Sequence, residues 1–258
     1  MKNRKRVLIT GASSGIGRAC AEMLAKEGQY DLWLWARRSD RLAEVQKQCL
    51  EINPSIDVVI SPCDIKKPAE IEVALKQRQD LLIQTAVLIN NAGLARGVEP
   101  VGSAHWTDWE EMIDVNIKAL FFMTRQVLPS MMENKDGHIV NIGSVAGKHV
   151  YPGGAVYCST KFAVRAFSDA LRLDVMGKGV RVTNIEPGMV NTEFSLVRLK
   201  DQKKADAVYQ GMTPLTANDI AETVLWSLKR PAHVNIQEIV VYPTDQAGVG
   251  FVHRENQK

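Results

Sequence analysis

The chain has 258 residues, of which 45% are apolar and 24% charged, and its formal net charge is +3. That length and composition suit one globular domain with a sizeable core. The small net charge gives no reason to expect a nucleic-acid partner, and no apolar run approaches the ~20 residues of a membrane-spanning helix. Four cysteines without a CxxC pair predict free thiols in a cytoplasmic protein.

A cluster of small residues lies between the first two predicted elements. Residues 7–10 predict a buried strand, and apolar residues from Ile16 to Leu24 recur at helical spacing. Small residues let backbone amides approach a pyrophosphate, and a helix N-terminus favours its negative charge. A tight turn is the alternative, but strand, cluster and helix together favour nucleotide binding. The cluster is Gly11, Ala12, Ser13, Ser14, Gly15, Ile16 and Gly17.

Two arginines follow the second predicted strand, residues 31–36. In the dinucleotide-binding pattern, a carboxylate about 20 residues beyond the glycines binds the ribose 2′-hydroxyl of NAD. Here that position falls near Ala36, and Arg37 and Arg38 come next. No carboxylate repels a phosphate there, and two guanidiniums are available to bind one. The sequence therefore predicts NADP, with solvated loop arginines as the alternative.

Further strand ends carry residues suited to a ligand crevice. Residues 56–60 predict a third strand, and Asp64 beyond it either accepts a hydrogen bond from the adenine amino group or caps the next helix. That helix is expected at residues 68–79. Residues 86–89 predict a fourth strand, and small and amide residues at its carboxyl end suit a nucleotide crevice. They are Asn90, Asn91, Ala92 and Gly93.

Asn116 interrupts a long apolar helical stripe that runs from Trp109 to Met131. A buried amide is costly unless it is hydrogen-bonded. Asn116 is therefore either a satisfied core side chain that holds the backbone or an active-site amide that orders a water for proton relay.

Residues 144–161 carry the chemistry. A fifth predicted strand, residues 138–142, leads into Ser144, and Tyr157 and Lys161 share one face of a predicted helix because four residues separate them. A free tyrosine has a pKa of about 10 and is a poor base at neutral pH. A nearby ammonium favours the phenolate. The stretch therefore predicts a proton-transfer site at which an alcohol or carbonyl meets a nicotinamide.

Seven alternations of strand and helix with short joins predict an α/β fold. We expect one domain over residues 1–258, a Rossmann-type doubly wound parallel sheet of about seven strands with helices on both faces. Residues 190–212 lack periodicity and predict a lid over the site. Residues 244–258 form a tail without an assigned structure.

These motifs resemble those of the short-chain dehydrogenases/reductases over residues 5 to 245. The resemblance implies that Tyr157 is the general acid/base, that Lys161 binds the nicotinamide ribose and lowers the pKa of the tyrosine, that Ser144 orients the substrate oxygen and that Asn116 holds a relay water. It implies that Asp64 and Ile65 meet the adenine, and Asn91, with Ala92 and Gly93, the adjoining ribose. Pro187, Gly188, Val190 and Thr192 would lie on the nicotinamide side. The motifs are Thr10-Gly-x-x-x-Gly-Ile-Gly17, Asn90-Asn-Ala-Gly93, Asn116, Ser144, Tyr157-x-x-x-Lys161 and Pro187-Gly188.

A closer resemblance is to the NADP-dependent 3-hydroxy acid dehydrogenases. It rests on Tyr151-Pro-Gly-Gly154, residues 186–198 and 230–236, and Val252-His253-Arg254. It implies serine, allo-threonine or 3-hydroxypropionate as substrate, with Tyr151 among the substrate residues. Such an acid needs a cation near its carboxylate, and Arg198 of the lid or Arg254 of the tail is the candidate. Either arginine could instead be a surface residue.

Other functions remain open at this stage. The same site could reduce a sulfonated aldehyde such as sulfoacetaldehyde, a ketone or a pterin carbonyl. A nucleotide sensor without turnover is disfavoured, because it has no use for a base beside the nicotinamide. No metal is expected, since the five histidines lack ligand spacing. The resemblance implies a homo-oligomer, either a tetramer or a dimer.

Overall fold

A single parallel sheet forms the centre of the protein. The computed structural model describes residues 4–255. Seven strands pair in the order β3-β2-β1-β4-β5-β6-β7, all of them parallel. The strand order reverses between β1 and β4, which opens a crevice at the carboxyl ends of these strands. The strands are β1 (Lys5–Thr10), β2 (Tyr30–Ala36), β3 (Val58–Pro62), β4 (Thr85–Asn90), β5 (Gly137–Ile142), β6 (Val180–Pro187) and β7 (Glu238–Val241).

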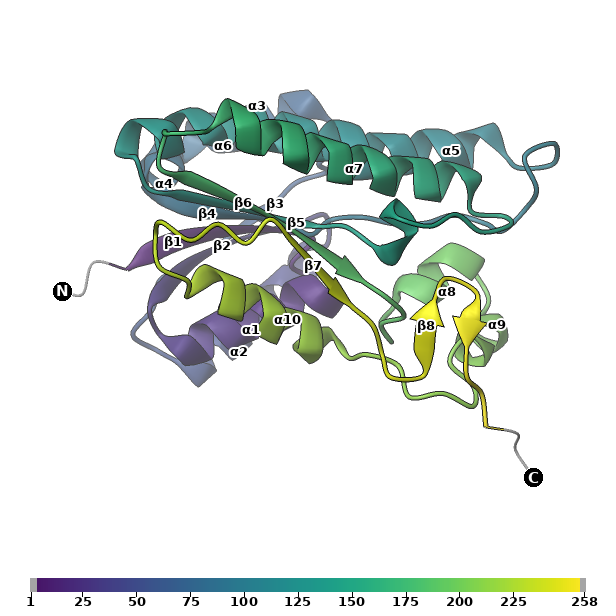
Figure 1. The fold of residues 1–258 in the computed structure, drawn as a ribbon. Helices are drawn as coiled ribbons and strands as arrows, with labels where there is room; N and C mark the ends of the chain where they lie inside the picture. Colours follow the sequence, from purple (N-terminus) through teal and green to yellow (C-terminus); the bar gives the residue numbers. More distant parts are fainter. Residues whose placement is uncertain (1–3, 256–258) are drawn as a thin grey trace.

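Helices cover both faces of the sheet (Figure 1). Helices α1 (Gly15–Glu27), α2 (Ser39–Ile52) and α10 (Ala217–Leu228) lie on one face. The opposite face carries α3 (Pro68–Gln77), α4 (Gln79–Gln84), α5 (Trp106–Ile113), α6 (Leu120–Asn134) and α7 (Ala155–Asp174). The predicted single-domain, doubly wound fold is confirmed.

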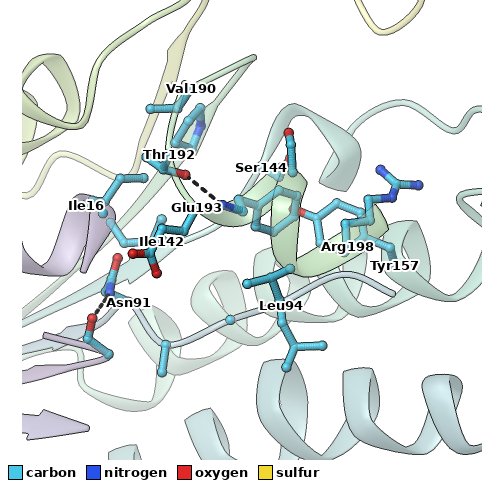
Figure 2. A pocket seen from close by; sticks show the side chains of 18 of the residues that line it. Ile16, Asn91, Leu94, Ile142, Ser144, Tyr157, Val190, Thr192, Glu193 and Arg198 are labelled. Carbon is cyan, nitrogen blue, oxygen red and sulfur yellow. Dashed lines mark hydrogen bonds between the residues drawn. The ribbon is translucent and has the colours of Figure 1, made fainter. Parts of the chain in front are cut away.

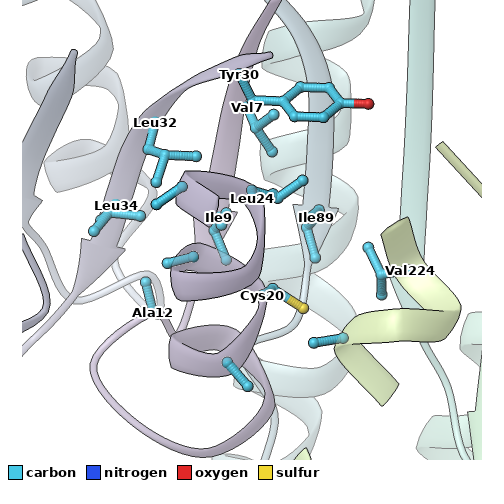
Figure 3. Packing of buried hydrophobic residues seen from close by; sticks show 14 of the residues in the cluster. Val7, Ile9, Ala12, Cys20, Leu24, Tyr30, Leu32, Leu34, Ile89 and Val224 are labelled. Carbon is cyan, nitrogen blue, oxygen red and sulfur yellow. The ribbon is translucent and has the colours of Figure 1, made fainter. Parts of the chain in front are cut away.

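Both faces of the sheet are buried. Val7 and Ile9 of β1 pack with α1 in one core, whereas Leu8 between them belongs to the core on the other side, because side chains alternate along a strand. Figure 3 shows Val7 and Ile9 with Leu24 of α1 and Val224 of α10. Burial on both faces explains why these strands are continuous apolar runs in the sequence.

Three segments differ from the sequence-based expectation. The long helix expected over residues 109–131 is α5 and α6 joined by a π-helix, η1 (Asp114–Ala119), which contains Asn116. The helix expected over residues 68–79 is α3, which ends at Gln77, and a further short helix, α4, follows it. In the described part of the tail, β8 (Gln246–Gly248) and β9 (Phe251–Val252) form an antiparallel hairpin, while residues 256–258 lie outside the described part of the chain.

The segment predicted to be a lid, residues 190–212, is called the lid below and contains two short helices, α8 (Phe194–Leu199) and α9 (Gln202–Ala207). They lie beside the tail hairpin, past the carboxyl end of the sheet (Figure 1). The backbone amide of Met189 donates to the Gln246 side chain over 2.8 Å, which joins the hairpin to the start of the lid. Of the helices between residues 4 and 255, none is long and apolar enough to cross a membrane.

Candidate active site

A cavity of about 640 Å³ opens at the carboxyl edge of the sheet. Figure 2 shows Ile16 and Asn91 on one side of it, Tyr157 and Arg198 on the other, and Glu193 between them. Except for Gly17, Asn116 and Arg254, the catalytic candidates and the residues predicted to bind cofactor or substrate line this cavity. The lining candidates are Gly11, Ser13, Ser14, Gly15, Ile16, Arg37, Arg38, Asp64, Ile65, Asn91, Ala92, Gly93, Ser144, Tyr151, Tyr157, Lys161, Pro187, Gly188, Val190, Thr192 and Arg198.

The glycine-rich turn is packed too tightly for a side chain at Gly17. A Cβ there would lie 2.5 Å from both the Gly11 carbonyl oxygen and Asn91 Nδ2. Asn91 Nδ2 donates to the Thr10 carbonyl over 2.9 Å and to the Gly11 carbonyl over 3.2 Å. These two hydrogen bonds stabilise the turn. Gly17 therefore shapes the turn without lining the cavity.

The N-terminus of α1 suits an anion. Ser14 is the N-cap, yet its side chain does not cap the helix, and the first turn of α1 contains no acidic residue. The amides of that first turn have no partner within the helix. Their orientation and the helix dipole favour a negative charge, so the residues present fit the pyrophosphate of a dinucleotide.

A cluster of arginines adjoins this turn. The Arg38 guanidinium donates to Ser13 Oγ over 3.2 Å and to Ser14 Oγ over 2.9 Å, and it also reaches Glu193 Oε2 over 3.3 Å. Arg41 donates to Glu193 Oε1 over 2.6 Å. Arg41 was not predicted from the sequence, although its place one turn after Arg38, at the start of α2, could have indicated it. Arg37 is exposed and lines the cavity.

Tyr157 and Lys161 both lie on the buried face of α7. Burial raises the pKa of Tyr157, and so does the neighbouring Tyr151, whereas a hydrogen bond with Ser144 and the charge of Arg198 lower it. Lys161 Nζ lies 5.9 Å from the centroid of the tyrosine ring.

That Lys161 lowers the pKa of Tyr157 stays a prediction, because the groups that act on the phenol in this structure are Tyr151, Ser144, Arg198 and Cys158. Lys161 Nζ points to the end of β5 and donates to the Ile142 carbonyl over 2.9 Å. Burial lowers the pKa of Lys161 to about 8, against the opposing charge of Glu186. Ser144 and Arg198 are the groups that favour the phenolate here.

Asn116 is buried, and both its amide oxygen and its amide nitrogen form hydrogen bonds with the protein. Its Oδ1 accepts from the Leu94 amide over 2.9 Å, and its Nδ2 donates to the Leu94 carbonyl over 2.8 Å and to Thr160 Oγ1 over 3.0 Å. These contacts match the first sequence-based alternative, a core amide that holds the backbone. A Cβ on Gly93 would lie 3.4 Å from Asn116 Oδ1 and 3.6 Å from Lys161 Nζ, so both groups border the same small space.

Helix α8 brings Arg198 over the catalytic face. Its guanidinium carbon lies 5.9 Å from the centroid of the Tyr157 ring, and Nη1 donates to the Tyr151 hydroxyl over 3.0 Å. Phe194 of the same helix packs on Tyr157 with a centroid distance of 5.7 Å. Gly154 permits this arrangement, because a Cβ there would lie 2.5 Å from the Tyr151 ring.

For two candidates, the structure favours one of the sequence-based alternatives over the other. Arg254 does not line the cavity, and its guanidinium binds backbone carbonyls of the lid, with 3.0 Å to Val208. This placement favours the alternative that Arg254 is a surface residue. Asp64 accepts from the Lys66 amide over 3.1 Å, and Lys67 is the N-cap of α3, so Asp64 does not cap that helix.

Other cavity residues were missed by the sequence reasoning. They come from the lid and the tail hairpin, where no periodic pattern marked them, although Glu193 and Phe194 lie in the stretch 186–198 on which the closer resemblance rests. They include Glu193, Phe194, Tyr209 and Gln246.

A buried carboxylate, that of Glu186, acts on Lys161 through its charge. Glu186 of β6 is fully buried and accepts from Asn184 Nδ2 over 2.8 Å. Burial and the charge of Glu238 raise the pKa of Glu186 to about 7, against the lowering effect of Lys148 and Arg165.

Comparison with known proteins defines the class. A family model described as short chain dehydrogenase matches residues 5–203. The chain belongs to the short-chain dehydrogenase family, and the predicted family resemblance is confirmed.

Several relatives match over nearly their whole length. The chain is 44% identical to the NADP-dependent 3-hydroxy acid dehydrogenase of Escherichia coli (strain K12), with 96% of this chain and 99% of that protein covered. It is 42% identical to sulfoacetaldehyde reductase 2 of Chromohalobacter salexigens, with 95% and 96% covered. The closed form of a serine dehydrogenase complexed with NADP⁺ superposes with a TM-score of 0.88 at 43% identity, covering 97% of this chain and all of that one (100%).

Replacing Glu186 with glutamine should change how stability depends on pH. Because the folded-state pKa of Glu186 is raised from 4.5 to about 7, its protonation stabilises the fold fully below pH 4.5, and this contribution is lost as the pH rises through about 7. The free energy of unfolding of the wild type relative to Glu186→Gln should therefore fall across that window, by at most about 1.4 kcal/mol per pH unit.

Urea unfolding at several pH values measures this difference. Glu222→Gln, which removes an exposed carboxyl on α10, should give a curve parallel to that of the wild type. A constant difference between the wild type and Glu186→Gln would contradict the raised pKa.

Proposed function

We propose that this protein is an NADP(H)-dependent oxidoreductase whose substrate is an alcohol or carbonyl compound that carries an anionic group. Serine, allo-threonine and 3-hydroxypropionate are substrates of this kind. The observation that carries the proposal is Arg198, held beside Tyr157 in the cavity. The relatives named for NADP, for 3-hydroxy acids and for serine support it.

The cofactor would lie along the carboxyl edge of the sheet. The N-terminus of α1 would hold the pyrophosphate, and Arg37 and Arg38 the 2′-phosphate. When bound, NADP(H) accepts or supplies the hydride. The remaining assignments follow the cavity lining: Asp64 and Ile65 for the adenine; Asn91, Ala92 and Gly93 for the adjoining ribose; Lys161 for the nicotinamide ribose; Pro187, Gly188, Val190 and Thr192 for the nicotinamide side.

In the proposed reaction, Tyr157 exchanges a proton with the substrate oxygen. In the oxidation of an alcohol, the phenolate of Tyr157 accepts the hydroxyl proton while a hydride leaves the carbon that bears this hydroxyl. In the reduction of a carbonyl, the phenol of Tyr157 returns the proton to the oxygen. Ser144 donates to the oxygen as negative charge develops on it. Lys161 supplies a positive charge in a buried setting, and Asn116 would order a water near Lys161.

The charge of Arg198 is the argument for an anionic substrate. Its hydrogen bonds go to neutral acceptors, the Gly97 carbonyl at 3.0 Å and the Tyr151 hydroxyl. Within residues 4–255 no carboxylate lies within ion-pair distance of it, whereas nearby Arg96 pairs with Glu111 at 2.7 Å. A guanidinium that has no ion-pair partner in the described part of the chain, although its charge acts on the Glu99 carboxylate, favours a substrate carboxylate or sulfonate beside Tyr157. It gives a neutral ketone or a pterin no comparable partner.

A sulfonated aldehyde is the second candidate substrate. Sulfoacetaldehyde reductase 2 is among the relatives, and a sulfonate would meet Arg198 as a carboxylate does. Kinetics with 3-hydroxy acids and with sulfoacetaldehyde would rank the two. Because Arg198 reaches the site from residues 190–212, we also propose that this segment covers the bound substrate.

Replacing Arg38 with glutamine should weaken NADP⁺ binding about 10- to 100-fold and leave NAD⁺ binding unchanged, because a charge-assisted hydrogen bond contributes about 1.5–3 kcal/mol. Isothermal titration calorimetry with both dinucleotides measures this. Arg125→Gln, an exposed substitution on α6, is the matched control and should bind both as the wild type does. An equal loss for NAD⁺ and NADP⁺ would show that Arg38 does not recognise the phosphate.

Replacing Arg198 with methionine should raise KM for 3-hydroxy acids about 10- to 100-fold and leave KM for uncharged alcohols nearly unchanged, since only the acids lose a charged partner. Steady-state kinetics that follow NADPH formation provide the measurement. The control is Arg254→Met, which removes a guanidinium that binds the lid outside the cavity. Equal effects on charged and uncharged substrates would rule out an anion-binding role.

We further propose that the protein is a homo-oligomer. Large apolar side chains are exposed on and just after α7, including Leu173 (63% exposed) and Met176 (80%), and a second copy could cover them. Light scattering on the purified protein should give the mass of a dimer or tetramer; a monomer mass at micromolar concentration would refute this.

A further inference from the structure

Two ion pairs link the start of α8 in the lid to the arginines beside the glycine-rich turn. Glu193 is the N-cap residue of α8, and its carboxylate bridges two guanidiniums, from Arg38 and Arg41. Arg38 donates to the Glu193 carboxylate from Nη1 and to the hydroxyls of Ser13 and Ser14 from Nη2. One guanidinium therefore contacts both the lid and the glycine-rich turn.

A carboxylate that bridges two guanidiniums binds to them as a phosphate group would. Both anions accept charge-assisted hydrogen bonds from the planar forks of arginine. The pKa of Glu193 lies below its ordinary value: partial burial works to raise it, but the hydrogen bond from Arg41 and the charges of both arginines outweigh that effect. Glu193 is thus ionised at neutral pH and neutralises these arginines.

Helix α8 does not need this carboxylate to hold its place. The Thr192 hydroxyl accepts from the Phe194 amide over 3.2 Å at the start of the helix. Arg96 donates to the Val197 carbonyl over 2.6 Å, and Arg198 donates to the Gly97 carbonyl. These contacts hold α8 in place without the ion pairs between Glu193 and the two arginines.

We propose that Glu193 competes with the 2′-phosphate of NADP(H) for Arg38 and Arg41, and so sets the affinity of the protein for NADP(H) relative to NAD(H). The proposal rests on the role proposed above for Arg38. NAD⁺ carries no 2′-phosphate and leaves the carboxylate in place, whereas NADP⁺ must displace it. Arg41 then becomes a second phosphate-binding residue.

The competition should be modest in size. The side chains of all three residues are about 40% exposed, with 41% for each arginine and 43% for Glu193. Ion pairs exposed to this degree are worth a fraction of a kcal/mol to about 1 kcal/mol, and salt screens them. The expected change in cofactor affinity is therefore about two- to fivefold.

The test is calorimetric titration of Glu193→Gln with NADP⁺ and with NAD⁺. The variant should bind NADP⁺ about two- to fivefold more tightly than the wild type at low salt, with NAD⁺ unchanged and the gain reduced at high salt. Asp206→Asn, on α9 of the same lid and away from the arginines, removes the same charge and should leave both affinities unchanged. Glu193→Ala serves as a second variant, because glutamine still accepts hydrogen bonds from arginine.

A coupling measurement isolates the contact. In an Arg41→Gln background, the gain from Glu193→Gln should shrink, because one of the contested guanidiniums is already absent. Unchanged or weaker NADP⁺ binding by both Glu193 variants, or an equal gain for NAD⁺, would overturn the proposal. Failure of Arg38→Gln to discriminate between the dinucleotides would instead refute the proposed role of Arg38, so the two outcomes are distinguishable.

Discussion

Burial of the Tyr157 phenol is the constraint around which the site is arranged. Burial raises the pKa of the hydroxyl, so proton exchange at neutral pH requires groups that stabilise the phenolate. Ser144 supplies a hydrogen bond from the end of β5, and Arg198 supplies a positive charge from the lid. The pKa of Tyr157 therefore depends on two segments that are far apart in the chain, Ser144 after β5 and Arg198 of α8.

The parallel sheet makes that convergence possible. The strand order reverses between β1 and β4, so the strand ends on both sides of the reversal open onto one crevice. The glycine-rich turn follows β1, Asn91 follows β4, Ser144 follows β5, and Pro187 ends β6. Residues 190–212 and the tail hairpin lie past the carboxyl end of the sheet (Figure 1). The turns after the strands and the segment 190–212 both supply residues to the cavity.

The sequence predicted what local patterns encode. Continuous apolar runs revealed the buried strands, and fixed motif spacings placed nearly every candidate residue in the cavity. What it missed depends on contacts between distant segments. The π-helix around Asn116 forms where that side chain bonds with Leu94 and Thr160, and the pairing of Glu193 with Arg41 joins residues 152 positions apart. Neither contact has a signature in a single stretch of sequence.

The most direct test of the central claim is the turnover of Tyr157→Phe with NADP⁺ and a 3-hydroxy acid such as serine. Phenylalanine keeps the ring and its packing on Phe194 but removes the hydroxyl that exchanges the proton. We predict that kcat falls about 10²- to 10⁴-fold while NADP⁺ affinity stays close to that of the wild type. Turnover near the wild-type rate would contradict the assignment of Tyr157 as the proton-transfer residue.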